Sequence, residues 1–134
     1  MPHCVILYTP NIESNADLSG LCRALADEML KVFDEAGKQV FPTGGTRVLA
    51  FPAVHYAVAD ANRDYAFIYI NVRMGLGRSD AIKKSAGDRL LFRAKEHLTP
   101  TFARDLIGLT LQIDESTGQV YDGKHSNLHP LFNK

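Results

Sequence analysis

The sequence predicts an α/β (α+β) fold in which two βαβ units form a four-stranded sheet with two helices on one face. Strand and helix patterns alternate in the order strand, helix, strand, first over residues 3–59 and again over residues 65–115. Strands joined by a helical crossover are usually parallel within each half. The chain has 134 residues, of which 46% are hydrophobic and 22% charged, so we expect a single domain over residues 1–134 with a substantial core.

The first half begins with an apolar, β-branched run, His3 to Thr9, which predicts a strand. Apolar residues then recur at spacings of three and four from Asp17 to Glu35, the period of one helical face, with Asn15 or Asp17 as the N-cap. A second strand is predicted over Thr46 to Ala59, bent or bulged at Pro52 because proline cannot donate to a strand ladder.

The second half begins with Tyr65 to Arg73, the strongest strand pattern of the chain and apolar enough for a central position. Ser79 is a good N-cap for a helix whose apolar stripe is Ile82, Ala86, Leu90, Leu91 and Ala94. Thr99 precedes a proline and predicts a short capped helix ending near Asp105. Alternating apolar and polar residues over 109–113 predict the last strand.

Two features predict assembly with further copies. With both helices on one face of the sheet, the aromatic residues of the strand over 65–73 lack a cover on the other face. The tail over 118–134 is polar at first but ends in apolar residues, Leu128, Leu131 and Phe132, which should dock on a surface. We therefore expect an oligomer.

Charge and composition exclude several classes of partner. Fifteen Lys and Arg balance 15 Asp and Glu, so the chain lacks the broad basic field of a nucleic-acid binder. The apolar run over 4–8 is too short to cross a membrane, and the start lacks the pattern of a signal peptide, so we expect a cytoplasmic protein. Cys4 and Cys22 have no metal-ligand spacing, and we expect no metal site and no disulfide.

The start of the chain is chemically unusual. Catalytic signatures such as G-x-S-x-G, a P-loop or H-E-x-x-H are absent, and the Gly75-Leu76-Gly77 loop lacks the third glycine of a dinucleotide site. Removal of Met1 would leave Pro2 with a free secondary amine. An α-amino group has a reference pKa near ~8, and burial or nearby cations lower it toward the range of a general base. The alternative is that Pro2 merely permits removal of the methionine.

Two arginines suit an anionic ligand. Arg47 follows a Gly44-Gly45 loop at the start of a predicted strand, and Arg78 follows a glycine-containing loop before a predicted helix. Guanidinium groups at such positions can bind carboxylates with two parallel hydrogen bonds, and either cation could lower the pKa of a nearby amine. The competing interpretation is that both are ordinary solvated loop residues.

Five segments in compatible order carry a resemblance to a known family: Met1-Pro2-His3, Phe41-Pro42-x-x-Gly45-x-Arg47, Asp64-Tyr65-Ala66-Phe67, Gly75-x-Gly77-Arg78-Ser79 and His129-x-Leu131-Phe132. Together they resemble 5-carboxymethyl-2-hydroxymuconate isomerase, a family of the tautomerase superfamily, over nearly the whole chain. This chain has Leu7 late in its first strand, where the family often carries an acid.

The resemblance implies a tautomerase-like homotrimer and an isomerase without a cofactor, acting on a small polycarboxylate in the degradation of aromatic compounds. It implies that Pro2 is the base, that Arg47 and Arg78 bind substrate carboxylates, and that Phe41 contributes an apolar pocket wall. Two alternatives stay open. One is a tautomerase relative with another substrate, such as a dehalogenase or a phenylpyruvate tautomerase. The other is a non-catalytic trimeric βαβ module that binds a small anion or a protein.

Overall fold

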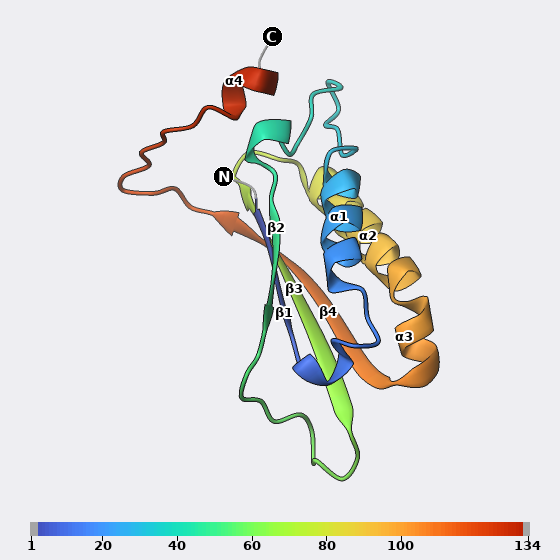
Figure 1. The fold of residues 1–134 in the computed structure, drawn as a ribbon. Coiled ribbons are helices and arrows are strands. Elements are labelled where there is room, and N and C mark those ends of the chain that lie inside the picture. Colours follow the sequence, from blue (N-terminus) through green and yellow to red (C-terminus); the bar gives the residue numbers. More distant parts are fainter. Residues whose placement is uncertain (1–2, 133–134) are drawn as a thin grey trace.

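The computed structural model describes residues 3–132 as two βαβ units followed by a tail (Figure 1). The first unit consists of β1 (His3–Tyr8), α1 (Leu18–Met29) and β2 (Val48–Pro52), with the short 3-10 helices η1 (Pro10–Ile12) and η2 (Thr43–Gly45) in its connections. The second consists of β3 (Tyr65–Gly75), α2 (Asp80–His97), α3 (Thr99–Arg104) and β4 (Leu106–Ser116), and the tail ends in α4 (His129–Phe132).

The four strands form one sheet in the order β2-β1-β3-β4. The strands within each unit are parallel, and the two units meet through the antiparallel pair β1 and β3. Figure 1 shows α1, α2 and α3 on the same side of this sheet. The predicted fold class is confirmed, and so is the inner position of β3.

Strand alternation decides which side chains form the core. In β3, Ile68 and Ile70 are fully buried, while Phe67, between the buried residues Ala66 and Ile68, is exposed on the other face. The buried set packs against α1 and α2, where Leu25 and Leu90 are each 1% exposed. Each such side chain contributes roughly 1.5 to 3 kcal/mol when it is fully buried.

Helix α1 is shorter than its apolar pattern predicts. The expectation of a helix over Asp17–Glu35 is wrong at its end, because the helix stops at Met29. The Asp34 carboxylate accepts hydrogen bonds from the backbone N–H groups of Ala36 and Lys38, at 2.9 and 2.8 Å, and stabilises a tight turn. Such local bonds compete with helix formation. Val32 is buried too, but it belongs to the chain after the helix and not to a helical face.

Strand β2 is also shorter than expected. The prediction of a bent or bulged strand over Thr46–Ala59 is wrong, because β2 ends at Pro52. The backbone N–H of Ala53 donates to the carbonyl of Tyr8 at 2.7 Å, just beyond the end of β2. The chain then crosses to β3 through an irregular loop that Figure 1 shows at the end of the sheet far from η2.

The helix caps follow the sequence in two cases out of three. The side chains of Asp17 and Ser79 accept backbone hydrogen bonds at the starts of α1 and α2, as predicted. The short helix predicted from Thr99 to about Asp105 is present as α3, but its predicted cap is wrong, since Leu98 and not Thr99 occupies the cap position. The hydroxyl of Thr99 instead donates to the carbonyl of Lys95 at 3.1 Å, which continues the end of α2.

The sheet face opposite the helices is open in the single chain. Leu7 lies opposite Phe51 on one side and Tyr69 on the other, and the first two side chains are 45% and 48% exposed. Phe67 adds a further aromatic ring at 36% exposure. This apolar face is what the sequence predicted for a sheet with helices on one side only.

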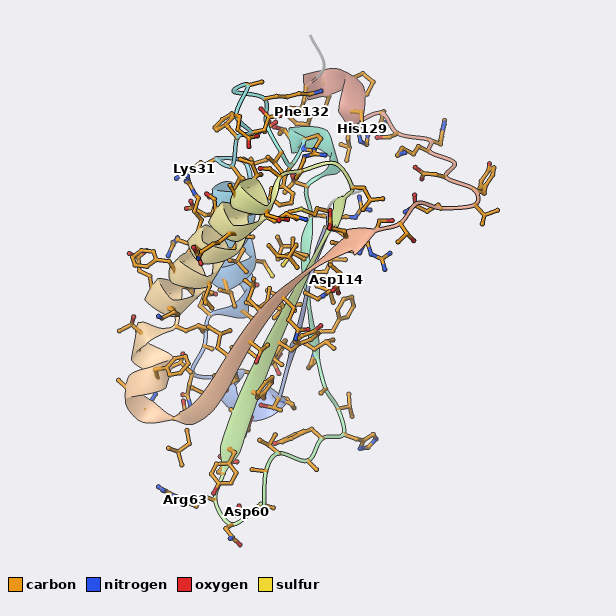
Figure 2. All side chains as sticks on the ribbon, turned by 180° about the vertical axis from the view of Figure 1, so that it is seen from behind. Lys31, Asp60, Arg63, Asp114, His129 and Phe132 are labelled. Atoms are coloured by element: carbon orange, nitrogen blue, oxygen red, sulfur yellow. The ribbon has the colours of Figure 1, made fainter. Side chains whose placement is uncertain are left out.

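After β4 the tail loops out beyond the end of the sheet and returns to end beside η2 (Figure 1). Figure 2, seen from behind, shows His129 and Phe132 of α4 close to this turn. A Cβ atom on Gly44 would lie 3.1 Å from the Cα of His129, so the two backbones approach closely. Leu131 nevertheless stays 62% exposed. Among residues 3–132, no helix is long and apolar enough to cross a membrane.

Candidate active site

Three strand ends meet where β1 begins. The backbone N–H of Cys4 donates to the carbonyl of Arg47, at 3.0 Å, just before β2 starts. On the other side His3 lies opposite Arg73, close to the end of β3. Pro2, the predicted base, lies outside the described residues and is covalently linked to His3. The start of β1 is therefore flanked by the loops that carry the predicted arginines.

Arg47 is exposed and lines a groove between α1, η2, β2 and α4. The groove has a volume of about 620 Å³, and Thr43, Thr46 and Phe132 are among its lining residues. Arg23 lines it too, but its guanidinium is engaged by the Asp27 carboxylate at 2.8 Å. In the described part of the chain the Arg47 guanidinium has no ion pair, so its charge is available to an anion.

Arg78 is half-buried, and its guanidinium is hydrogen-bonded to the backbone of the segment that follows α1. Its Nη2 donates to the carbonyl of Val40 at 3.1 Å, and the neighbouring Ser79 hydroxyl donates to the Glu35 carboxylate at 2.7 Å. These bonds fix the loop before α2 against the segment that follows α1. A guanidinium has five N–H donors, so one bond to Val40 leaves donors for a carboxylate.

Phe41 does not reach the surface. Its side chain is 0% exposed, and it follows Val40, whose backbone N–H bonds to Val32 at 2.9 Å. In the single chain Phe41 therefore anchors in the core the segment whose Val40 carbonyl accepts the hydrogen bond from Arg78. The aromatic side chain that does line the Arg47 groove is Phe132, which the sequence indicated only as part of an apolar tail.

The two thiols are unsuited to nucleophilic chemistry. Cys4 and Cys22 are both free, as expected. Burial, and to a smaller extent the nearby Cys22, raises the pKa of the Cys4 thiol to about 12. Burial also raises the pKa of Cys22. Within the segment that the structure describes, no cluster of His, Cys, Asp and Glu could hold a metal ion.

The chain is similar to known proteins over nearly its whole length. The family model described as 5-carboxymethyl-2-hydroxymuconate isomerase matches residues 2–132. A 5-carboxymethyl-2-hydroxymuconate Delta-isomerase of Escherichia coli is 29% identical over 132 residues, which cover 98% of this chain and 99% of that protein.

Two solved structures are similar over nearly the full length. A 5-carboxymethyl-2-hydroxymuconate delta-isomerase superposes with a TM-score of 0.95 at 50% identity, covering 100% of this chain and 94% of the other. A 5-carboxymethyl-2-hydroxymuconate isomerase from Deinococcus radiodurans R1 gives a TM-score of 0.84 at 30% identity, covering 99% and 95%. The chain belongs to the 5-carboxymethyl-2-hydroxymuconate isomerase family.

Proposed function

We propose that this protein isomerises 5-carboxymethyl-2-hydroxymuconate, with Pro2 as the base and Arg47 and Arg78 as carboxylate ligands. The observation that carries the proposal is the meeting of strand ends at the start of β1, where Cys4 bonds to the Arg47 carbonyl and His3 pairs with the end of the strand that leads to Arg78. The match of residues 2–132 to the isomerase family supports it.

The reaction moves one proton and two double bonds. The Pro2 amine accepts the proton of the 2-hydroxyl group, and the oxygen electron pair forms the C2 carbonyl. The C2–C3 double bond shifts to C3–C4, and the electron pair of the C4–C5 bond accepts a proton at C5 from the Pro2 ammonium. The oxidation state does not change, so the electron balance requires no cofactor.

The arginines act on the charge that develops between the two transfers. Deprotonation of the dienol spreads negative charge from its oxygen to C5, and a fixed cation stabilises that charge more in the transition state than in the substrate. The same cations favour the neutral amine of Pro2, because a nearby positive charge lowers the pKa of an amine. The amine is available only after Met1 is removed, since the nitrogen of a Met1-Pro2 peptide bond is an amide.

We also propose that the protein is a homotrimer whose subunits cover one another's open sheet faces. Leu7, Phe51 and Phe67 present an apolar surface that water would otherwise contact, and a surface of this kind marks a contact between proteins. The exposed apolar residues of α4, among them Leu131, offer a second patch for the same contacts.

The proposal is tested by following the ultraviolet absorbance of the dienol with processed protein. We expect rapid loss of 5-carboxymethyl-2-hydroxymuconate and appearance of the conjugated ketone, with phenylpyruvate and a chloroacrylate as comparison substrates. Faster turnover of either comparison substrate would replace the proposed substrate by that of a tautomerase relative. No turnover of any of them, in a protein whose mass shows that Met1 is absent, would refute an isomerase with a Pro2 base.

A further inference from the structure

Arg73 is a third arginine at the start of β1. We infer, on the basis of the proposed function, that Arg73 binds the carboxymethyl carboxylate of the substrate and makes the enzyme selective for a tricarboxylate dienol. The proposed substrate carries three carboxylates, and Arg47 and Arg78 account for two of them. A dicarboxylate dienol such as 2-hydroxymuconate lacks the third.

The position of Arg73 follows from the pairing of β1 and β3. Arg73 lies directly opposite His3 in the antiparallel ladder, which places their Cα atoms about 4.5 to 5.5 Å apart. Val72 and Met74 on either side are buried toward the helices, so Arg73 points to the open face, and it is exposed there. Arg73 thus approaches the start of β1 from the open face, whereas Arg47 approaches along the neighbouring strand β2.

Within the described part of the chain, Arg73 keeps its charge free of an ion pair. Its cross-strand partner on β4 is Asp114, whose carboxylate accepts a hydrogen bond from the Asn71 side chain at 2.7 Å. Among residues 3–132 no ion pair to Arg73 is found. Lys83, at the start of α2, shows the contrast: its ammonium contacts the carboxylates of Asp80 and Glu115 at 3.2 and 3.1 Å.

The open face changes character along the strands, from apolar at the level of Leu7 to charged at the level of Arg73. At the level of Leu7 its neighbours across the ladder are aromatic, Phe51 and Tyr69. At the level of His3 the open face carries Arg73 and Asp114. Subunits that meet through the apolar part would keep the charged part at the edge of the contact, beside the proposed base.

The test compares two substrates in one variant. Arg73→Ala should lower kcat/KM for 5-carboxymethyl-2-hydroxymuconate by about 10- to 100-fold, the effect of losing a charged hydrogen bond, mainly through KM. The same variant should convert 2-hydroxymuconate within about 3-fold of the wild-type rate, because that substrate has no group for Arg73 to bind. Arg73→Gln, which keeps most of the side-chain length without the charge, should show the same change in selectivity.

Arg63→Ala is the matched control. Arg63 is also an exposed arginine, but Figure 2 shows it at the far end of the sheet, away from Asp114 and α4. Its removal should leave both substrates unaffected. Equal losses on both substrates in Arg73→Ala and Arg73→Gln, or no loss on either, would overturn the assignment of Arg73 alone. Wild-type protein that isomerises neither dienol would overturn the proposed function together with the inference that rests on it.

Discussion

In the proposed mechanism Arg78 has two tasks at once, and this makes its replacement by lysine informative. One nitrogen of its guanidinium donates to the Val40 carbonyl at 3.1 Å, and we propose that the others bind a substrate carboxylate. Lysine has a single nitrogen at the end of a flexible stem. It can bond to the carbonyl or to the carboxylate, but it cannot reproduce the planar, two-point contact to both.

The magnitude follows from the bonds that are lost. A charged hydrogen bond contributes about 1.5 to 3 kcal/mol, and about 1.4 kcal/mol corresponds to a factor of ten in rate. Arg78→Ala should therefore lower kcat/KM by roughly 10- to 1,000-fold, the upper part arising if the cation also stabilises the dienolate. It should also lower the free energy of unfolding by about 1 to 3 kcal/mol, because Val40 is buried and its carbonyl loses the hydrogen bond from Arg78. Arg78→Lys should remain about 10-fold or more below wild type.

The assay is steady-state isomerisation of the dienol, with urea unfolding of each variant alongside. Arg63→Ala again serves as the control for loss of one positive charge. Wild-type kinetics in Arg78→Lys would show that two-point recognition by Arg78 is not used. Unchanged kinetics in Arg78→Ala would show that Arg78 does not bind the substrate.

Three further predictions concern stability and assembly. Because burial raises the folded pKa of Cys4 from 9.0 to about 12, the unfolded thiol ionises first, so the free energy of unfolding should fall between about pH 9 and 12; urea titrations of wild type and Cys4→Ala over this range check it, and equal slopes would contradict it. Phe41→Ala should destabilise the protein by about 3 to 5 kcal/mol in urea unfolding, whereas a solvent-facing pocket wall would cost far less. Phe51→Asp should convert a particle of about three times the 14.8 kDa chain mass to a monomer in sedimentation, and an unaltered mass would exclude the open face around Phe51 as the contact.

Strand β3 was predictable because its sequence leaves little choice. Every second side chain of β3 is buried, and those between them are half-buried or exposed. Turn residues bound the strand on both sides. The end of α1 was not predictable from periodicity, because Val32 continues the apolar spacing whether the backbone is helical or turned. The Asp34 side chain decides it, through two backbone hydrogen bonds that a pattern of apolar residues does not contain.

Some features of the candidate site could be predicted from the sequence and others could not. That Arg47 and Arg78 belong to loops at strand ends could be predicted from the glycines that precede them. Whether Phe41 forms a pocket wall or a core anchor could not, since both environments select an apolar side chain. Its complete burial identifies the core in the single chain. The sequence predicts Arg73 only as the end of a strand, because its proximity to the start of β1 depends on the register between β1 and β3.

The most direct test of the central claim compares two forms of the protein that differ only at the N-terminus. In one form Met1 is removed, as verified by intact mass, and in the other an added residue or tag precedes Pro2. The processed form should isomerise the dienol, with an ascending limb in the pH profile of kcat/KM below the ~8 reference of an α-amino group, because nearby cations lower the amine pKa. The blocked form should be folded, of the same size in sedimentation, and inactive. Equal rates in the two forms would show that the Pro2 amine is not the base.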